Sequence, residues 1–234
     1  MPLSVETPAM PFHALLSSPL GDILLTAGDH GLTGLYFTDQ RDCPQLPGLA
    51  PVSDIVSQPS AGTVGGKAAR TLKAVRADTA AEGELFARND AWSKTGALQE
   101  GQAAALRPLQ ADTPAGILAV LEQTRQELDE YWHGKRQVFD MPLDPQGTRF
   151  QKQVWQALLA VPCGATLSYG ELGQQAGLGA GHGRAVGTAV GSNPISIIIP
   201  CHRILARNGT LNGYGGGLSR KARLLEIEGF RIRA

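Results

Sequence analysis

The 234-residue sequence predicts an α+β fold: a small N-terminal sheet with one helix, then a mostly helical domain containing a helix-turn-helix. Three observations indicate this. Short apolar and β-branched runs lie near the N-terminus, a long helical pattern follows mid-chain, and short amphipathic stretches separated by glycines fill the C-terminal third. We expect one domain from residues 1–41 and 114–147, a low-complexity segment over 42–113, and a second domain over 148–234.

The N-terminal strands are expected at Phe12–Ser17, Ile23–Ala27 and Gly34–Phe37, because apolar and β-branched residues dominate these runs. Turn-forming residues separate them at Pro19–Asp22 and Gly28–Gly31. The pattern is typical of an antiparallel hairpin extended by a third strand.

A helix is expected over Gly116–His133, where apolar residues recur at helical spacing from Ile117 to Trp132. Thr113-Pro114 suggests an N-cap and first turn, and Gly134 a stop.

Residues 42–113 are rich in Ala, Gly, Thr, Ser and Gln and contain only two aromatic residues, Phe86 and Trp92. The stretch Ala68–Ala77 could be helical, and most of the segment is expected to be a flexible insertion. A tether, a partner site and a neutral expansion are all open as its role.

In the C-terminal domain, helices are expected over Arg149–Ala160, Tyr169–Gln175, Arg184–Val190 and Ser219–Glu228. Ser168 is a plausible N-cap for the second helix. A glycine-rich link joins the second and third, as in a helix-turn-helix.

Charge is divided unevenly along the chain. Lys plus Arg and Asp plus Glu both number 21, yet residues 148–234 hold ten basic residues against three acidic ones. A basic C-terminal part beside an acidic N-terminal part is typical of one-sided nucleic-acid binding that weakens with salt. Three cysteines, no signal peptide and no membrane-spanning run favour a reducing, cytoplasmic setting.

A possible nucleophile lies near the C-terminus, in the run from Ile199 through Pro200 to Cys201-His202-Arg203. The apolar run before it predicts a buried, extended segment that delivers the thiol to a fixed place. Thiols are strong nucleophiles when a neighbouring base removes the proton. For a lone Cys-His pair, a buried structural cysteine is the more common explanation.

The surrounding residues favour the catalytic interpretation, because residues 148–230 resemble the O6-alkylguanine-DNA alkyltransferase family. The resemblance rests on Pro200-Cys201-His202-Arg203 and on five further matches in the same order: Ser168-Tyr169-Gly170, Arg184-Ala185-Val186-Gly187, Asn193-Pro194, Tyr214 with Gly215-Gly216-Gly217-Leu218, and Leu224-Leu225 with Glu228-Gly229. A weaker resemblance covers the N-terminal hairpin.

The resemblance implies a one-step transfer in which Cys201 takes the alkyl group from O6 of guanine or from O4 of thymine, and the protein is consumed. His202 would remove the thiol proton through an ordered water, and Glu228 would orient His202. Tyr169 would protonate the departing guanine or assist rotation of the nucleotide, and Asn193 would belong to the same catalytic set. Neither cofactor nor metal is implied.

The same resemblance assigns substrate binding to Tyr214, Gly215, Gly216 and Ile199. Many family members carry serine where this chain has Gly215, so only backbone donors are expected there. It assigns DNA binding to Arg184, Ala185, Gly187 and Arg203, although Arg203 taken alone is better explained as a charge anchor for its loop. The implied partner is duplex DNA containing O6-alkylguanine, bound by a monomer after the nucleotide is flipped.

Glu228 is expected near the C-terminal end of a helix, where the helix dipole disfavours a carboxylate. An ordinary surface glutamate is the simpler explanation for that position alone. Two other functions stay open: a lesion-binding helix-turn-helix protein without chemistry, and a cysteine hydrolase that turns over. A fused cysteine-rich regulator domain is not expected, because the N-terminal half holds only Cys43.

Overall fold

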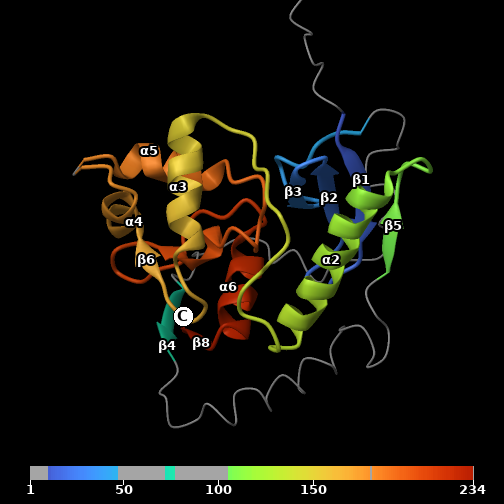
Figure 1. Ribbon diagram of the computed structural model, residues 1–234. Coiled ribbons are helices and arrows are strands. Elements are labelled where there is room, and N and C mark those ends of the chain that lie inside the picture. Colours follow the sequence, from blue (N-terminus) through green and yellow to red (C-terminus); the bar gives the residue numbers. More distant parts are fainter. Residues whose placement is uncertain (1–9, 47–71, 77–104, 180, 234) are drawn as a thin grey trace, which may run out of the picture.

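The computed structural model describes residues 10–46, 72–76, 105–179 and 181–233 (Figure 1). It confirms the mixed α+β architecture, with an antiparallel sheet in the N-terminal part and a helical C-terminal part. Among the helices of these residues, none combines the length and apolar character needed to cross a membrane.

The sheet contains β1 (Phe12–Leu16), β2 (Ile23–Gly28) and β3 (Gly31–Phe37), close to the expected strands. A fourth strand, β5 (Leu106–Pro108), pairs with β1, so the order is β3-β2-β1-β5. Helix α2 (Ala115–Trp132) packs against this sheet through its apolar stripe (Figure 1). Burial of that stripe against the sheet stabilises this part of the chain.

Two elements differ from expectation in the segment predicted to be flexible. Leu106–Pro108 is part of the N-terminal sheet, and the possible helix at Ala68–Ala77 contains a strand, β4 (Lys73–Arg76). β4 pairs antiparallel with β8 (Phe230–Arg233), and Leu72, Ala74 and Ile232 pack on a small apolar cluster there. Pairing with a distant strand thus overrides local helical preference. Residues 47–71 and 77–104 lie outside the described residues.

The start of α2 also differs in detail. Pro114, not Thr113, holds the N-cap position, and no side chain caps the helix. The Thr113 hydroxyl instead donates to the Gln110 carbonyl, at 2.7 Å, and so closes the turn before the helix.

The C-terminal helices agree with the sequence patterns to within a residue or two: α3 (Arg149–Leu159), α4 (Tyr169–Gln175), α5 (Gly183–Gly191) and α6 (Leu218–Ile227). Ser168 caps α4 as expected, and Glu171 completes a capping box. Helices α4 and α5 pack on each other and on α3, where Trp155 is a core residue whose indole donates to the Ala189 carbonyl. This packing holds the helix-turn-helix in place.

One hydrophobic core runs across the expected domain boundary, from the sheet and α2 to α3, α5 and the segment before Cys201. The edge strand β3 bonds directly to that segment. Leu35 donates to the Pro194 carbonyl at 2.8 Å and accepts from the Ser196 amide at 3.1 Å. The N-terminal sheet therefore helps to position the loop that carries the cysteine.

Candidate active site

The apolar run before Cys201 is buried as expected, but it is not extended. The Ile198 amide bonds to the Ser196 carbonyl and the Ile199 amide to the Ile195 carbonyl, which winds residues 195–199 into tight turns. Ile197 has φ 71°, a conformation that β-branched residues rarely adopt and that costs about 1–3 kcal/mol. The full burial of this side chain offsets that strain.

Asn193 organises these turns. Its side-chain oxygen accepts from the Ile195 amide at 3.1 Å, and its nitrogen donates to the Ile199 carbonyl at 2.8 Å. The same nitrogen lies 3.1 Å from the Cys201 sulfur. Asn193 thus binds the loop backbone and the thiol together. Ile199 is fully buried, and its carbonyl is the group that anchors Asn193.

Cys201 begins a short 3₁₀ turn, η4 (Cys201–Arg203), and is 6% exposed. Burial raises the pKa of the thiol above its ordinary value. The Asn193 amide, the Lys221 ammonium and the backbone amides of Cys201 and His202 act against that rise because they favour the thiolate. The free site therefore holds a protonated thiol, with thiolate-stabilising groups already around it.

His202 and Glu228 form a buried pair. His202 Nε2 lies 2.8 Å from Glu228 Oε1, and neither side chain is exposed to solvent. Glu228 is held in turn by Arg203, whose Nε and Nη2 donate to its two oxygens at 2.9 and 2.8 Å, and by the Tyr131 hydroxyl at 2.9 Å. The expectation of a functional carboxylate at this helix end is strengthened by this burial, since a surface glutamate would be solvated.

The charges of this cluster fix the histidine tautomer. Burial alone would raise the pKa of Glu228, but His202 and Arg203 outweigh it and bring the pKa to about 2. An ionised carboxylate only accepts hydrogen bonds, so His202 Nε2 carries the proton and Nδ1 keeps its lone pair. Burial holds the pKa of His202 below its ordinary value despite the carboxylate. Nδ1 is buried and has no hydrogen-bond partner among the described residues.

Arg203 corrects one prediction. Its guanidinium donates hydrogen bonds to Glu228 and to the Val161 carbonyl, and the residue is 5% exposed. It cannot reach a phosphate from there, so the assignment to DNA binding is wrong. It is the charge anchor that the residue alone suggested, linking η4 to the C-terminal ends of α3 and α6.

Lys221 is a site residue that the sequence did not reveal. It is fully buried on α6, and its ammonium donates to the carbonyls of Ile204, Asn212 and Gly213 at 2.5, 2.8 and 3.3 Å. Burial lowers its pKa to about 8, and the Cys201 charge acts in the opposite direction. This cation therefore braces the segment from Ile204 to the start of the glycine-rich loop and favours the thiolate.

Two tyrosines flank the thiol. Tyr169 starts α4, its ring lies against Gly187 of α5, and its hydroxyl approaches Gly213 of the glycine-rich loop. Burial, and after it the Cys201 charge, raises the pKa of Tyr169, and the same two causes raise the pKa of Tyr214 well above its ordinary value. Both phenols are therefore protonated at neutral pH and able to donate.

The glycine-rich loop is closely packed. A Cβ atom at Gly216 would lie 2.7 Å from the Tyr214 ring and 2.8 Å from the Phe37 ring, so only glycine fits without movement. At Gly215 a Cβ atom would meet the Gln40 amide nitrogen at 3.0 Å. Arg220 stacks on Phe37, 4.3 Å from its ring centre, and bonds to the Gly216 carbonyl. The N-terminal sheet thereby braces the loop.

The residues expected to bind DNA lie on α5. Arg184 and Ala185 are exposed in its first turn, and Gly187 is half-buried against Tyr169.

Cys163 is half-buried, and burial raises its pKa to about 11, which fits the expectation that it is not a nucleophile. The sequence did not point to Tyr131 or to Lys221 as site residues. Tyr131 lies at a helical position of an apolar stripe, and that spacing indicates only a packing role.

Comparison with known proteins assigns the chain to a family. Residues 149–230 match the family model described as 6-O-methylguanine DNA methyltransferase, DNA binding domain. A relative from Mycolicibacterium paratuberculosis, named methylated-DNA–protein-cysteine methyltransferase, is 50% identical over 117 residues, which are 50% of this chain and 68% of the relative. The chain belongs to the methylated-DNA–protein-cysteine methyltransferase family.

A family member of the same name from Mycobacterium tuberculosis is 52% identical over 108 residues, 46% of this chain and 65% of that protein. The match thus spans just under two thirds of that relative. The crystal structure of the M. tuberculosis O6-methylguanine methyltransferase aligns with 94% of this chain and 93% of its own, at 30% identity and TM-score 0.57. A structure of M. tuberculosis OGT in complex with DNA aligns with 92% and 90%, at 29% identity and TM-score 0.56.

Proposed function

We propose that this protein repairs alkylated DNA by moving a methyl or modest larger alkyl group from O6 of guanine to Cys201. One observation carries the proposal: the Cys201 sulfur lies beside the Asn193 amide, and the next residue, His202, is bonded to a buried, ionised Glu228. This is a nucleophile, a base and a group that orients the base.

The transfer begins with loss of the thiol proton. His202 Nδ1, the nitrogen that Glu228 leaves unprotonated, takes this proton through an ordered water, as the family resemblance implies. Glu228 stabilises the imidazolium that forms. The Asn193 amide and the Lys221 charge stabilise the developing thiolate. Because the free thiol has a raised pKa, deprotonation is coupled to attack and the cysteine stays unreactive without substrate.

The thiolate then attacks the alkyl carbon. A sulfur–carbon bond forms as the carbon–O6 bond breaks, and the electron pair of that bond leaves with the guanine. Tyr169, protonated and close to the glycine-rich loop, is the donor of a proton to the departing base or assists its rotation. No co-reactant removes the alkyl group from the Cys201 sulfur afterwards. Each protein molecule therefore reacts once and keeps the alkyl group. O4-alkylthymine presents the same reacting oxygen–alkyl bond and is a second expected substrate.

The target nucleotide must leave the helix, because a buried thiol cannot reach a stacked base. In this proposal the exposed Arg184 on α5 fills the gap, and Ala185 and Gly187 give α5 a thin face for close approach to a groove. The names of the relatives and the DNA complex of the M. tuberculosis protein support DNA as the partner.

The test is mass spectrometry of the intact protein and its peptides after incubation with duplex DNA carrying one O6-methylguanine. We expect one methyl group per protein, on the Cys201 peptide, matched by restored guanine. Cys163→Ala is the matched control and should react like the unchanged protein. Cys201→Ala should bind the duplex without reaction.

The other outcomes identify the two alternatives. Tight lesion binding with unmodified Cys201 would make the protein a lesion sensor. Many cycles of p-nitrophenyl ester cleavage per protein would make it a cysteine hydrolase. If the protein showed no methyl transfer and no binding to the lesion duplex, the proposal would be overturned.

A further inference from the structure

The β4–β8 strand pair carries an exposed row of cations. In its register Lys73 faces Arg233, and Val75 faces Arg231, and all four residues are exposed. The alternate residues of the two strands lie on the other face, toward the apolar cluster under the pair. They are the pairs Ala74 with Ile232 and Arg76 with Phe230. One face of this ribbon therefore holds the pair in place, and the other presents positive charge.

The arrangement is unfavourable without an anion. Like charges directly opposite on neighbouring strands repel each other, and Lys73 and Arg233 occupy such positions. Among the described residues, no acidic side chain forms an ion pair with Lys73, Arg231 or Arg233. Neither strand contains an acidic residue. A bound polyanion would relieve the repulsion.

A loop connects this charged face to the start of the helix-turn-helix. The loop after β7 (Ile204–Leu205) bonds to β4, since Ala74 donates to the Gly209 carbonyl and Leu211 to the Leu72 carbonyl. The parallel pairing of β7 with β6 (Leu167–Ser168) sets the same loop beside the start of α4.

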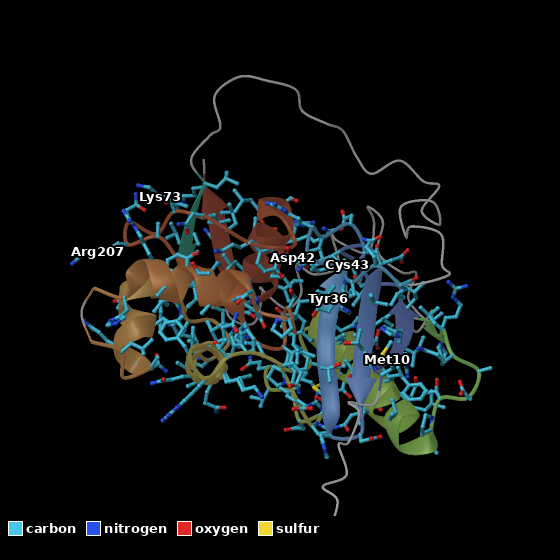
Figure 2. The ribbon with its side chains drawn as sticks, turned by 90° about the horizontal axis from the view of Figure 1, so that it is seen from above. Met10, Tyr36, Asp42, Cys43, Lys73 and Arg207 are labelled. Atoms are coloured by element: carbon cyan, nitrogen blue, oxygen red, sulfur yellow. The ribbon has the colours of Figure 1, made fainter. Side chains whose placement is uncertain are left out.

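Hydrogen bonds to Ser168 lower the pKa of Glu171 on α4, and the charge of Arg207, exposed in this loop, adds to that lowering, so Arg207 lies near α4. Figure 2 shows Lys73 and Arg207 at the same end of the molecule, away from Met10. The basic row therefore lies on the α4 side of the helix-turn-helix.

From these observations we propose that Lys73, Arg231, Arg233 and Arg207 form an auxiliary surface for the phosphate backbone of duplex DNA beside the α4–α5 site. The inference rests on the proposed function. It gives a role to β4, one of the described parts of the 42–113 segment. Phosphates are evenly spaced along a duplex, so a row of flexible cations binds them without sequence preference.

The test is the salt dependence of binding to an undamaged duplex by the full chain. Lys73→Gln combined with Arg233→Gln should weaken binding at low salt. Each lost phosphate contact removes about 0.9 from the slope of log K against log salt, so the slope should become shallower by about 1.8. Arg107→Gln with Lys135→Gln, exposed on β5 and after α2, is the charge-matched control and should leave the slope unchanged.

Stability separates this role from a structural one. Because the two cations repel each other, the double variant should unfold at the same temperature or a higher one while it binds DNA less well. An unchanged salt slope, or an equal change in the control, would overturn the inference. Loss of binding to duplex RNA but not DNA would overturn the choice of partner.

Failure of the proposed function has a different signature. In that case the unchanged protein itself would neither bind duplex DNA nor accept an alkyl group from free O6-benzylguanine. The auxiliary surface alone is refuted when both of those activities are present and the slope of the double variant matches that of the unchanged protein.

Discussion

The Tyr131 hydroxyl on α2 donates a hydrogen bond to Glu228 at the end of α6, with 2.9 Å between the oxygens. The two residues are 97 positions apart, and both are buried. Glu228 in turn holds His202, so a helix of the N-terminal part is connected by two hydrogen bonds to the proposed base. The N-terminal and C-terminal parts of the chain are therefore connected by hydrogen bonds at the proposed active site as well as by a common hydrophobic core.

Tyr131→Phe should slow alkyl transfer and destabilise the fold. A hydrogen bond to a charged group contributes about 1.5–3 kcal/mol, and we expect a loss of that order in the free energy of unfolding. Denaturant unfolding and single-turnover rates across pH measure both effects. Tyr36→Phe, half-buried on β3, is the control. A Tyr131→Phe protein with unchanged stability and pH–rate profile would show that the bond has no energetic role.

Glu228→Gln should change how stability depends on pH. The pKa of Glu228 falls from 4.5 to about 2 on folding, so its carboxylate stabilises the fold above about pH 4.5, and this contribution is lost as pH falls toward 2. The difference in unfolding free energy between the two proteins should be large at neutral pH, about 3–5 kcal/mol, because the variant leaves Arg203 buried without its counter-charge. Urea titrations should find that difference narrowing below pH 4.5, and a constant difference would contradict the assignment.

Asn193→Asp should raise the thiol pKa of Cys201 further. It replaces a donor 3.1 Å from the sulfur with an anion that repels the thiolate. We expect transfer from free O6-benzylguanine to slow by more than about tenfold, since a shift of one pKa unit is about 1.4 kcal/mol. Thiolate absorbance against pH measures the pKa directly. Asn208→Asp, on an exposed turn, should change neither quantity.

Gly216→Ala should lower the transfer rate more than Gly215→Ala. The first places a methyl group against the Tyr214 and Phe37 rings, which cannot both move away. The second meets only the end of the flexible Gln40 side chain. Single-turnover kinetics compare the two, and equal rates would mean that the packing of Tyr214 does not control the reaction.

Arg184→Ala should weaken repair of a duplex more than reaction with free O6-benzylguanine. Its proposed role is to fill the space of the flipped nucleotide, and a free base leaves no such space. Parallel rate measurements on the two substrates test this, and equal losses would remove the role.

The local elements could be predicted from the sequence because their signals are local. The helices from α3 to α6 follow apolar spacing, capping residues and glycine breaks, and α4 begins at Ser168 as the capping pattern indicates. The proposed catalytic set around Cys201 was assigned through the family resemblance, whose matches are spread over residues 168–229.

The errors share one cause, which is that distant residues decided the outcome. The strand at Lys73–Arg76 exists because Phe230–Arg233 offers it a partner and an apolar cluster. Arg203 does not fit the expected DNA contact because its guanidinium is hydrogen-bonded to Glu228, which lies 25 residues away in the sequence. The turns before Cys201 replaced an extended segment because Asn193 bonds to the loop backbone.

Residue type and short-range spacing in the sequence were enough to predict the α+β order of elements and the basic character of the C-terminal part, and the family resemblance pointed to Cys201 and His202 as the proposed nucleophile and base. Only the tertiary structure decided the burial of Lys221, the bond from Tyr131 to Glu228 and the cationic face of β4–β8. Burial and pairing arise when segments far apart in the chain meet, and that meeting changes a residue's pKa, its partners and its role.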